Sequence, residues 1–437
     1  MSKVTVNFGN VQGKVKPMHA VNNGPIRRQR INNFEEYKAS GIPFARTHDA
    51  SFYEGYGSEH VVDIQAIFPD FSKNPHNPDS YDFDLTDDYL QDIIDAGAQV
   101  FFRFGTKIEH WRKKYGSIVP ADFNKWATVC EHIIMHYNEG WANGFHHNIM
   151  YWEIWNEPDG KNPDGSQPNW SGTPEEYYEL YKVTATRLKK RFPHLKIGGP
   201  ASAEIAGDWT RAFLKYLTAD GNRVPLDFFS WHQYNVFPAC VRLHGDQVRK
   251  CLNDAGYTET ESILDEYNCF EDFEDNYAPS VLNVISMHGA AYTAACMAEG
   301  QASDVNMLMY YDTAPCYFNG LFSLYTMKPL KGYYPFVMFS KLYELEGNAE
   351  CVSDNEHVYA VAATNGEKRC VMITHYRWDK AKNDEAVEVV LNGVSDGEWI
   401  AEFLDEERTM EKQTVSAVNG KLTLNMSEDC VVLLTKE

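Results

Sequence analysis

Eight short apolar runs are the feature that most limits what this chain of 437 residues can fold into. They lie at residues 17–22, 42–47, 98–104, 148–155, 195–199, 226–232, 262–267 and 305–311. Runs this apolar are typical of strands that are buried on both faces, and helix-like stretches lie between successive runs. Eight such βα units favour a closed parallel barrel, so we predict an α/β fold of the (β/α)8 TIM-barrel type.

The stretches between the runs carry the signals of amphipathic helices. In residues 85–97 the apolar residues recur on one helical face, and Gly97 supplies a stop. A second helix is predicted at 173–192, where Thr173 is placed to cap the first turn and Glu176 follows three residues later. A doubly wound open sheet is the alternative, but no G-x-G-x-x-G pattern follows any early run.

The hydrophobic pattern of the sequence changes after about residue 345. Short strands of alternating apolar and polar residues follow one another, separated by tight turns that leave no room for helices. The first residues alternate in the same way. We therefore predict two domains, a catalytic barrel over 15–345 and an antiparallel β-sandwich built from 1–14 plus 346–437.

Composition narrows the classes of function. Hydrophobic residues make up 43% and charged residues 23%, as expected for a chain that buries a large core. Sixty-two acidic against 40 basic residues give a net charge of -22, which repels phosphate backbones and anionic lipid headgroups. We therefore expect neither nucleic acid nor membrane as a partner.

The same data favour a location in the cytoplasm. No run approaches the roughly 20 apolar residues of a membrane span, and the N-terminal sequence lacks the apolar segment of a secretory leader. Nine cysteines include no C-x-x-C pair, which fits a reducing compartment. A homo-oligomer is compatible with the sequence.

Polar residues at the ends of the apolar runs indicate where the chemistry lies, because barrel enzymes carry their active sites at the carboxyl ends of the strands. The fourth run ends in YWEIWNEP, with Asn156 and Glu157, and the seventh ends in ILDEYN, with Glu266. Two glutamates at strand ends can converge across the barrel. Taken alone, each could equally be an ion-paired structural residue of the barrel.

Further motifs make the pattern specific. HAVNNGP follows the first run, Arg46 and His48 close the second, and SWHQYN with His232 and Tyr234 closes the sixth. Together with WEIWNEPD and LDEYN, these motifs resemble the retaining glycoside hydrolases of clan A. Over essentially its whole length the chain is similar to glycoside hydrolase family 39, which contains β-xylosidases and α-L-iduronidases. The resemblance implies a TIM barrel with a β-sandwich, no cofactor and no catalytic metal.

The resemblance assigns Glu157 as acid/base and Glu266 as nucleophile. Cleavage with retention needs a carboxylic acid to protonate the leaving oxygen and a carboxylate about 5.5 Å away to attack the anomeric carbon. An ionised Glu266 would favour the protonated form of Glu157, and this influence ends when Glu266 is consumed in the glycosyl ester. One residue can then serve as acid and afterwards as base.

The same resemblance suggests roles for four neighbours. Asn156 would donate to the sugar 2-hydroxyl, a contact that strengthens in the transition state. Tyr234 would donate to Glu266, and His232 would bind a sugar hydroxyl or the acid. Arg46 would lie beneath the nucleophile as a buried cation, with a purely structural ion pair as the alternative.

Other residues near the strand ends are candidate contacts to the substrate. His48 follows the second run, and Trp155 on the fourth is a candidate platform for a pyranose ring. Strand alternation leaves it open whether Trp155 points to the sugar or into the helix layer. Tyr311 and Asp312 end the eighth run, where the clan commonly has tryptophan, so the floor of the sugar site is expected to differ.

Two loops of opposite charge predict opposite preferences for the charge of the sugar. The segment 102–116 is the most basic loop, and its positive side chains are Arg103, Lys107, His110, Arg112 and Lys113. It could contact a carboxylated sugar or be an ordinary solvated loop. The segment 270–277, FEDFEDNY, carries four acids and would repel a polyuronate. A neutral pentose such as xylose is therefore favoured.

One pair of histidines has a spacing that could suit a metal site. His132 and His136 stand four residues apart on a predicted helix, but the glutamate of H-E-x-x-H is absent between them. We therefore interpret them as helix-surface histidines and expect no metal.

The sequence thus predicts a retaining exo-glycosidase, most simply a β-xylosidase, that hydrolyses small oligosaccharides or glycosides by double displacement. The alternatives are a uronidase, like α-L-iduronidase or β-glucuronidase, and an endo-acting hydrolase. A carbohydrate-binding pseudoenzyme is the alternative from another class.

Overall fold

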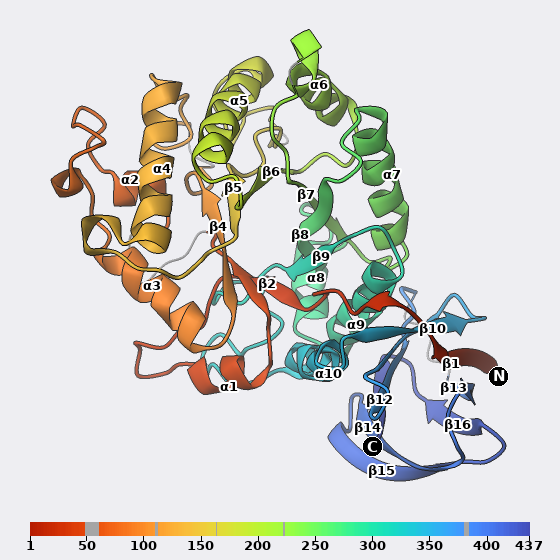
Figure 1. Ribbon diagram of the computed structural model, residues 1–437. Coiled ribbons are helices and arrows are strands. Elements are labelled where there is room, and N and C mark those ends of the chain that lie inside the picture. The colour runs from red at the N-terminus through yellow and green to blue at the C-terminus, as the bar shows by residue number, and fades with distance from the viewer. Residues whose placement is uncertain (49–60, 110–111, 163, 222, 380–383) are drawn as a thin grey trace.

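The structure is a computed structural model that describes residues 1–48, 61–109, 112–162, 164–221, 223–379 and 384–437. Figure 1 shows a ring of helices around a central barrel, with a second sheet at one side that holds both chain ends. The predicted α/β architecture, a parallel barrel followed by a β-module, is confirmed.

Parallel strands close the barrel in the order in which they follow one another along the chain. They are β2 (Ala20–Asn22), β3 (Phe44–Arg46), β4 (Gln99–Phe104), β5 (Tyr151–Ile154), β6 (Lys196–Ser202), β7 (Phe228–Asn235), β8 (Glu261–Cys269) and β9 (Met307–Tyr310). Each overlaps one of the eight apolar runs. The closure between β9 and β2, where Ala20 is in register with Met309, means that the barrel has no free edge.

Helices cover the outside of the barrel (Figure 1). They are α1 (Phe34–Ala39), α2 (Ile64–Ile67), α3 (Asp84–Asp95), α4 (Phe123–Glu139), α5 (Pro174–Arg191), α6 (Asp208–Leu217), α7 (Cys240–Asp254), α8 (Tyr277–Val284), α9 (Met287–Gln301) and α10 (Tyr334–Tyr343). The predicted cap of α5 is present, because Thr173 accepts from the backbone of Glu176 while Glu176 accepts from the backbone of Thr173.

Over the described residues, we find no single helix with both the length and the apolar character needed to cross a membrane. The adjoining helices α8 and α9, bent by 74° at their junction, meet those criteria only when taken together.

The lower interior of the barrel is closed by apolar side chains. Phe101, Phe228 and Ile263 are fully buried there, and the Phe101 ring lies 5.2 Å from that of Tyr151. Because side chains alternate along a strand, the inward residues two positions further on form the next layer up. That upper layer is where the polar residues of the strands gather.

The second sheet has nine strands in the order β15-β14-β17-β12-β11-β10-β1-β13-β16. They are β1 (Ser2–Lys14), β10 (Gly347–Ser353), β11 (Val358–Thr364), β12 (Arg369–His375), β13 (Glu385–Asn392), β14 (Gly397–Leu404), β15 (Thr409–Ala417), β16 (Lys421–Met426) and β17 (Cys430–Lys436). The end strands β15 and β16 contact each other, so the sheet curves around a core of its own.

The N-terminal strand joins this sheet, as the alternating first residues suggested. β1 lies antiparallel to β10 and parallel to β13, with Val4 in register with Val389. The parallel pair departs from the purely antiparallel arrangement predicted. It arises because β1 enters from the other end of the chain, so no tight turn constrains its direction relative to β13.

Candidate active site

A strained turn places Glu157 at the barrel mouth, the end at which the carboxyl ends of the strands meet. After β5 ends at Ile154, Trp155 has a φ of 78° and Glu157 a φ of 44°. Both lie in the left-handed region that non-glycine residues rarely adopt, at a cost of about 1–3 kcal/mol each. The Glu157 amide donates to the carbonyl of Ala201 on β6 at 2.8 Å, which holds the turn in place.

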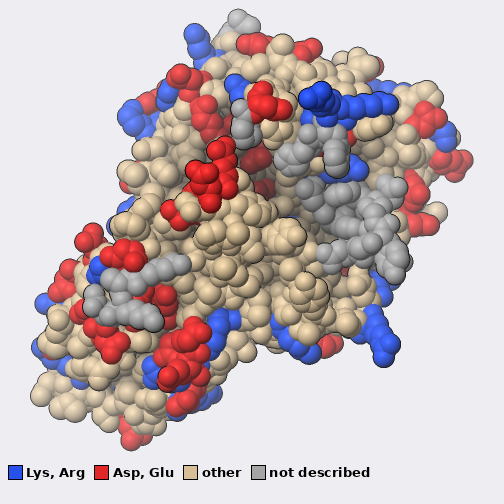
Figure 2. All heavy atoms as spheres, turned by 180° about the vertical axis from the view of Figure 1, so that it is seen from behind, with Lys and Arg blue, Asp and Glu red and all other residues tan. Residues whose placement is uncertain are grey.

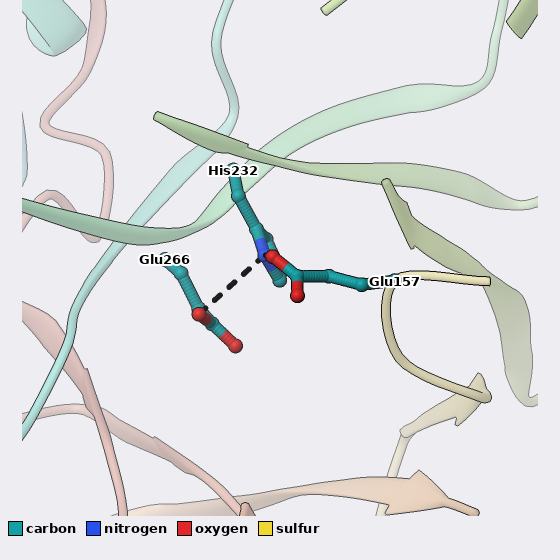
Figure 3. A group of neighbouring side chains, drawn as sticks. All are labelled: Glu157, His232 and Glu266. Atoms are coloured by element: carbon teal, nitrogen blue, oxygen red, sulfur yellow. Dashed lines mark hydrogen bonds and ion pairs between the residues drawn. The ribbon is translucent and has the colours of Figure 1, made fainter. Parts of the chain in front are cut away.

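Glu157, His232 and Glu266 face one another across the mouth (Figure 3). His232 Nδ1 shares a hydrogen bond of 2.7 Å with Glu157 Oε1 and lies 3.4 Å from Glu266 Oε2. A carboxylate oxygen of each glutamate lies within 4.8 Å of one on the other. The Glu157 side chain is 21% exposed and that of Glu266 only 6%, so Glu157 is the more accessible of the pair.

Glu266 is held as a carboxylate by donors and cations on three sides. Tyr234 donates to its Oε2 at 2.8 Å, Arg46 Nη1 donates to its Oε1 at 2.8 Å, and His48 Nε2 lies 3.1 Å from that same oxygen. Burial alone would raise the pKa of Glu266, but His232, His48 and Arg46 outweigh it and hold the pKa well below its usual range. An anionic, oriented carboxylate is suited to nucleophilic attack.

Beneath the two glutamates, Arg46 is fully buried among acidic groups. Its Nε lies 2.7 Å from Glu153 and 3.1 Å from Asp265, both also fully buried. Burial lowers the pKa of Arg46, yet the carboxylates of Glu153, Asp265 and Glu266 together raise it above its ordinary value. Arg46 is therefore a permanent cation that neutralises part of the acidic layer.

Glu153 and Asp265 form a coupled acid pair in this layer. Burial raises the pKa of Glu153, but Arg46 and a hydrogen bond with Asp265 lower it below the usual value. Burial and the charge of Glu153 raise the pKa of Asp265 well above its usual value. Glu153 is thus the ionised member and Asp265 the protonated one.

Two asparagines complete the immediate surroundings of the acid. Asn169 Nδ2 donates to Glu157 Oε2 at 3.0 Å, and Arg46 Nη2 donates to Asn156 Oδ1 at 2.7 Å. The second bond fixes the amide of Asn156, because its oxygen is occupied by the guanidinium. The amide hydrogens of Asn156 have no acceptor among the described residues, so they remain for a ligand.

Tyr311 and Asp312 follow β9 but occupy different places. The Tyr311 ring lies 5.2 Å from that of His48 and 6.4 Å from that of Tyr234, so it borders the mouth. Asp312 is buried behind it, where it accepts from Asn23 and from its own loop. Burial raises the pKa of Asp312 to about 6.

Trp155 and Arg103 do not join the group. The Trp155 side chain is buried and packs edge-on against Trp170, with ring centroids 5.1 Å apart. The left-handed turn breaks the strand alternation at Trp155 and directs its ring into the helix layer. Arg103 is 1% exposed and donates to the carbonyls of Thr106 and Thr47.

The basic loop is mostly solvated. Lys107, Arg112 and Lys113 are exposed, and His110 lies outside the described residues. At its centre the carboxylate of Glu109 accepts backbone hydrogen bonds from the segment 115–117. The loop therefore folds around an acidic group of its own.

The interpretation of His132 and His136 as surface residues is wrong, since both are buried. His132 contacts His76 at 3.3 Å and the carbonyl of Thr128 at 2.8 Å, and the ring of His136 stacks on Phe83. Aromatic neighbours on the loop before α3 cover this face of α4. The described residues that come closest to a metal-binding arrangement are Glu157, His232 and Glu266, and the hydrogen bond between His232 and Glu157 also suits proton transfer.

Sequence reasoning did not single out Glu153, Asp265 or Asn169. A signal existed for the first two, because a charged residue inside an apolar barrel run must be neutralised by a partner. Asn169 lies in an irregular loop after β5, and nothing in the sequence marks it.

Comparison with known proteins identifies relatives of this site and fold. The protein-family model described as glycosyl hydrolases family 39 matches residues 60–417 of this chain. A β-xylosidase of Caldicellulosiruptor saccharolyticus is 24% identical over 98% of this chain and 90% of its own length. A β-xylosidase of Geobacillus stearothermophilus is 29% identical over 35% of this chain and 31% of its own length.

Solved structures share the fold along the whole chain. A glucosidase from Croceicoccus marinus superimposes with a TM-score of 0.81 at 22% identity, covering 100% of this chain and 98% of its own. A monomeric β-xylosidase from Caulobacter crescentus gives a TM-score of 0.72 at 17% identity, covering 100% and 99%. At these identities the likeness establishes the fold, the barrel together with its appended sheet.

Proposed function

Because the chain belongs to glycosyl hydrolase family 39, and is therefore a glycoside hydrolase, we propose that it is a retaining, exo-acting β-xylosidase on small oligosaccharides or glycosides. In this proposal Glu157 is the acid/base and Glu266 the nucleophile. Both stand in the motifs on which the family resemblance depends.

The observation that carries the proposal is the short distance between the two carboxylates. Oxygens of Glu157 and Glu266 lie within 4.8 Å of each other. Retaining enzymes place their carboxyl groups about 5–5.5 Å apart, whereas inverting enzymes leave about 6.5–9.5 Å for a water molecule. The separation here leaves no room for water between nucleophile and sugar, so it favours direct attack.

The mechanism follows from the surroundings of each carboxyl group. Protonated Glu157 donates its proton to the glycosidic oxygen while the carboxylate of Glu266 attacks the anomeric carbon, and the bond to the leaving group breaks. A glycosyl ester on Glu266 results. Glu157, now a carboxylate, takes a proton from water, and the water oxygen attacks the anomeric carbon. This attack frees Glu266 and releases the sugar in its original anomeric configuration.

The neighbours support these steps through charge and orientation. Arg46 and Tyr234 hold Glu266 anionic and fixed before attack. The amide hydrogens of Asn156, left over after its bond to Arg46, are available to the sugar 2-hydroxyl. His48 and Tyr311 border the same space and are proposed to contact the glycone.

The charges around the mouth favour a neutral sugar. A uronate in a water-poor pocket requires a paired arginine, because burying its charge unpaired costs several kcal/mol. Arg103 is occupied by backbone carbonyls and lies 3.9 Å from Asp63, and Arg46 is engaged with three carboxyl groups. Figure 2 shows acidic side chains beside and inside a hollow of the molecular surface, which disfavours the approach of anions.

The curated relatives are named β-xylosidases, which supports xylose as the glycone. On the nucleophile side Phe273 is 52% exposed and packs edge-on against Tyr234, with ring centroids 5.3 Å apart. Phe273 therefore offers an exposed aromatic face beside Tyr234. We further propose a cytoplasmic location, consistent with nine free cysteines.

We propose that residues 1–14 and 346–437 form a supporting domain beside the catalytic barrel of 15–345. Tyr376 of this sheet donates to the carbonyl of Val236 at the end of β7, at 2.8 Å. His288 on α9 contacts Asp429 at 3.0 Å. A chain ending after Leu345 should expose this apolar interface and be insoluble, and a soluble, fully active fragment would contradict the supporting role.

The function is tested with a panel of aryl glycosides and two variants. The wild type should hydrolyse 4-nitrophenyl β-D-xyloside better than the corresponding glucuronide or iduronide. Glu157→Gln should lose natural glycosides but keep kcat/KM on dinitrophenyl glycosides, whose leaving groups need no proton. Glu266→Gln should lose all substrates, by about four orders of magnitude or more.

Glu271→Gln is the matched control, because Glu271 is an exposed glutamate on the loop after β8. It should retain wild-type rates throughout. Equal losses in Glu157→Gln and Glu266→Gln at every leaving group would overturn the assignment of their roles. A preference for the glucuronide would overturn the proposal of a neutral sugar, but it would still agree with a glycoside hydrolase.

A further inference from the structure

His232 bridges the acid/base and the buried acidic layer. Its Nδ1 lies 2.7 Å from Glu157 Oε1, and its Nε2 lies 3.5 Å from Asp265 Oδ1. The ring is 2% exposed and Asp265 is fully buried. The three side chains therefore form a line from the substrate side to the interior of the barrel.

The two facing atoms, 3.5 Å apart, form no regular hydrogen bond with each other and have no partner elsewhere among the described residues. Within the described ranges, neither His232 Nε2 nor Asp265 Oδ1 makes a hydrogen bond with a third group. Leaving a buried donor or acceptor unsatisfied is unfavourable. Each is therefore the best available partner of the other, and catalytic contacts of this kind are often long in the absence of substrate.

The other oxygen of Asp265 is directed to a different neighbour. Asp265 Oδ2 lies 3.1 Å from Arg46 Nε, and the carboxyl group is hydrogen-bonded to Glu153, the ionised member of the acid pair. When Asp265 is protonated and donates to Glu153, its other oxygen carries no hydrogen and can act only as an acceptor. That oxygen can accept only from a ring nitrogen that carries hydrogen.

We propose that Asp265 is a positioning residue that keeps hydrogen on Nε2 of His232, so that Nδ1 and Glu157 share the single proton used in catalysis. The inference rests on the proposed role of Glu157 as acid/base. Asp265 touches neither the substrate nor the reacting atoms and acts through the histidine ring, as the carboxylate partner of a catalytic histidine does.

The proton balance through the two steps is complete. Before reaction one proton lies between Glu157 Oε1 and His232 Nδ1. In the first step it passes to the glycosidic oxygen, which leaves Glu157 as a carboxylate and His232 neutral with hydrogen on Nε2. In the second step Glu157 takes a proton from water, and the shared position is refilled.

The charges around His232 are consistent with this assignment. Burial lowers the pKa of His232, but Glu266, Asp265 and Glu157 outweigh it and raise the pKa to about 9. The titratable groups at the ring itself are Glu157, Asp265 and Glu266. Each of the next groups contacts one of these three, and they are Arg46, His48, Glu153 and Tyr234. Tyr311 lies against Tyr234.

The kinetic test compares two substitutions of the same residue. Asp265→Asn copies the protonated acid, since its amide oxygen accepts from Nε2 and its NH2 donates to Glu153. We expect its kcat/KM within about threefold of the wild type for every leaving group. Asp265→Leu keeps the volume but offers no acceptor, so kcat/KM for poor leaving groups should fall about 100-fold.

The loss in Asp265→Leu should shrink to less than about fivefold for dinitrophenyl leaving groups, which need no proton. A purely structural role would lower kcat/KM equally for all leaving groups. An equal loss, or a loss in Asp265→Asn as large as in Asp265→Leu, would overturn the proposal.

A second measurement needs no substrate and no Leu variant. Nitrogen-15 spectra of histidine side chains, with the His232 signal identified by its absence in His232→Gln, report which ring nitrogen carries hydrogen. On the basic side of its pKa, we expect His232 in the wild type and in Asp265→Asn to carry hydrogen on Nε2. Hydrogen on Nδ1 would overturn the proposal, and this outcome is independent of whether Glu157 is the acid.

Discussion

The interior of the barrel has two layers of side chains that differ in chemistry although they lie two residues apart on the same strands. In the lower layer Phe44, Phe101 and Ile263 pack as a dry core. In the upper layer Arg46 on β3 and Asp265 on β8 take the corresponding positions, two residues further along each strand. The lower layer is an apolar core, and the upper layer orients and charges Glu157 and Glu266, the proposed catalytic pair.

The comparison explains why a barrel tolerates so many buried charges. The acidic groups of the upper layer surround one permanent cation, and they share protons where charge would otherwise accumulate. The lower layer needs no such compensation, because its free energy comes from apolar area and close packing. Substitutions in the two layers should therefore fail in different ways.

The largest effect is expected for Arg46→Met. Removing the cation leaves the charges of Glu153 and Glu266 uncompensated, which should lower the free energy of unfolding by about 3–5 kcal/mol. Glu266 should also take up a proton, so kcat/KM should fall by at least about three orders of magnitude. Urea unfolding and steady-state kinetics measure the two losses.

Arg46→Lys is the matched control for this change. It keeps the charge but not the forked geometry, so it should recover part of the stability and little of the activity. Full activity in Arg46→Met would show that Arg46 is not needed to keep Glu266, the proposed nucleophile, ionised.

Phe101→Ala should damage stability alone. The ring is fully buried against Tyr151 and Phe228, and its removal should cost about 3–5 kcal/mol in the free energy of unfolding. At a temperature where the variant is folded, kcat per folded molecule should stay within about threefold of the wild type. A loss of activity comparable to that of Arg46→Met would erase the distinction between the layers.

Asp312→Asn should change the pH dependence of stability. The folded pKa of Asp312 is raised to about 6 by burial, above the unfolded value near 3.8. Between these values the folded state binds more protons, so stability falls as pH rises through this window and the cost is complete above it. The asparagine should remove this cost, at most about 3 kcal/mol.

The measurement for Asp312→Asn is the free energy of unfolding at pH 4 and pH 7. The wild type should lose more stability than the variant between the two pH values, because the amide retains the acceptor for Asn23 and Ala314. Parallel curves would show that Asp312 is ionised throughout in the folded protein.

The sequence was informative wherever one local rule decides the structure. The apolar runs marked the barrel strands because both of their faces are buried, and polar residues at run ends marked the mouth because parallel strands end together. Arg46, Glu157, His232 and Glu266 were named as a group from these rules and the family motifs, and they lie in contact.

The sequence was uninformative where a turn, or a pairing between residues on different strands, determines where a side chain lies. Trp155 points away from the mouth because a left-handed φ breaks the alternation, which no composition rule predicts. Arg103 is occupied by the carbonyls of Thr106, in the loop after its own strand, and of Thr47, in the loop after β3. Asp265 acquires its proposed role through Glu153, a partner that lies 112 positions earlier in the chain.

Double displacement at Glu266, assisted by Glu157, is the central claim, and the configuration of the first-formed sugar tests it most directly. Proton NMR of an early time point, taken before mutarotation, distinguishes the two anomers of the released sugar. Two carboxylate oxygens within 4.8 Å predict a product with the same anomeric configuration as the substrate. A product of inverted configuration would contradict the claim, because it would require a water molecule to attack from the position that Glu266 occupies.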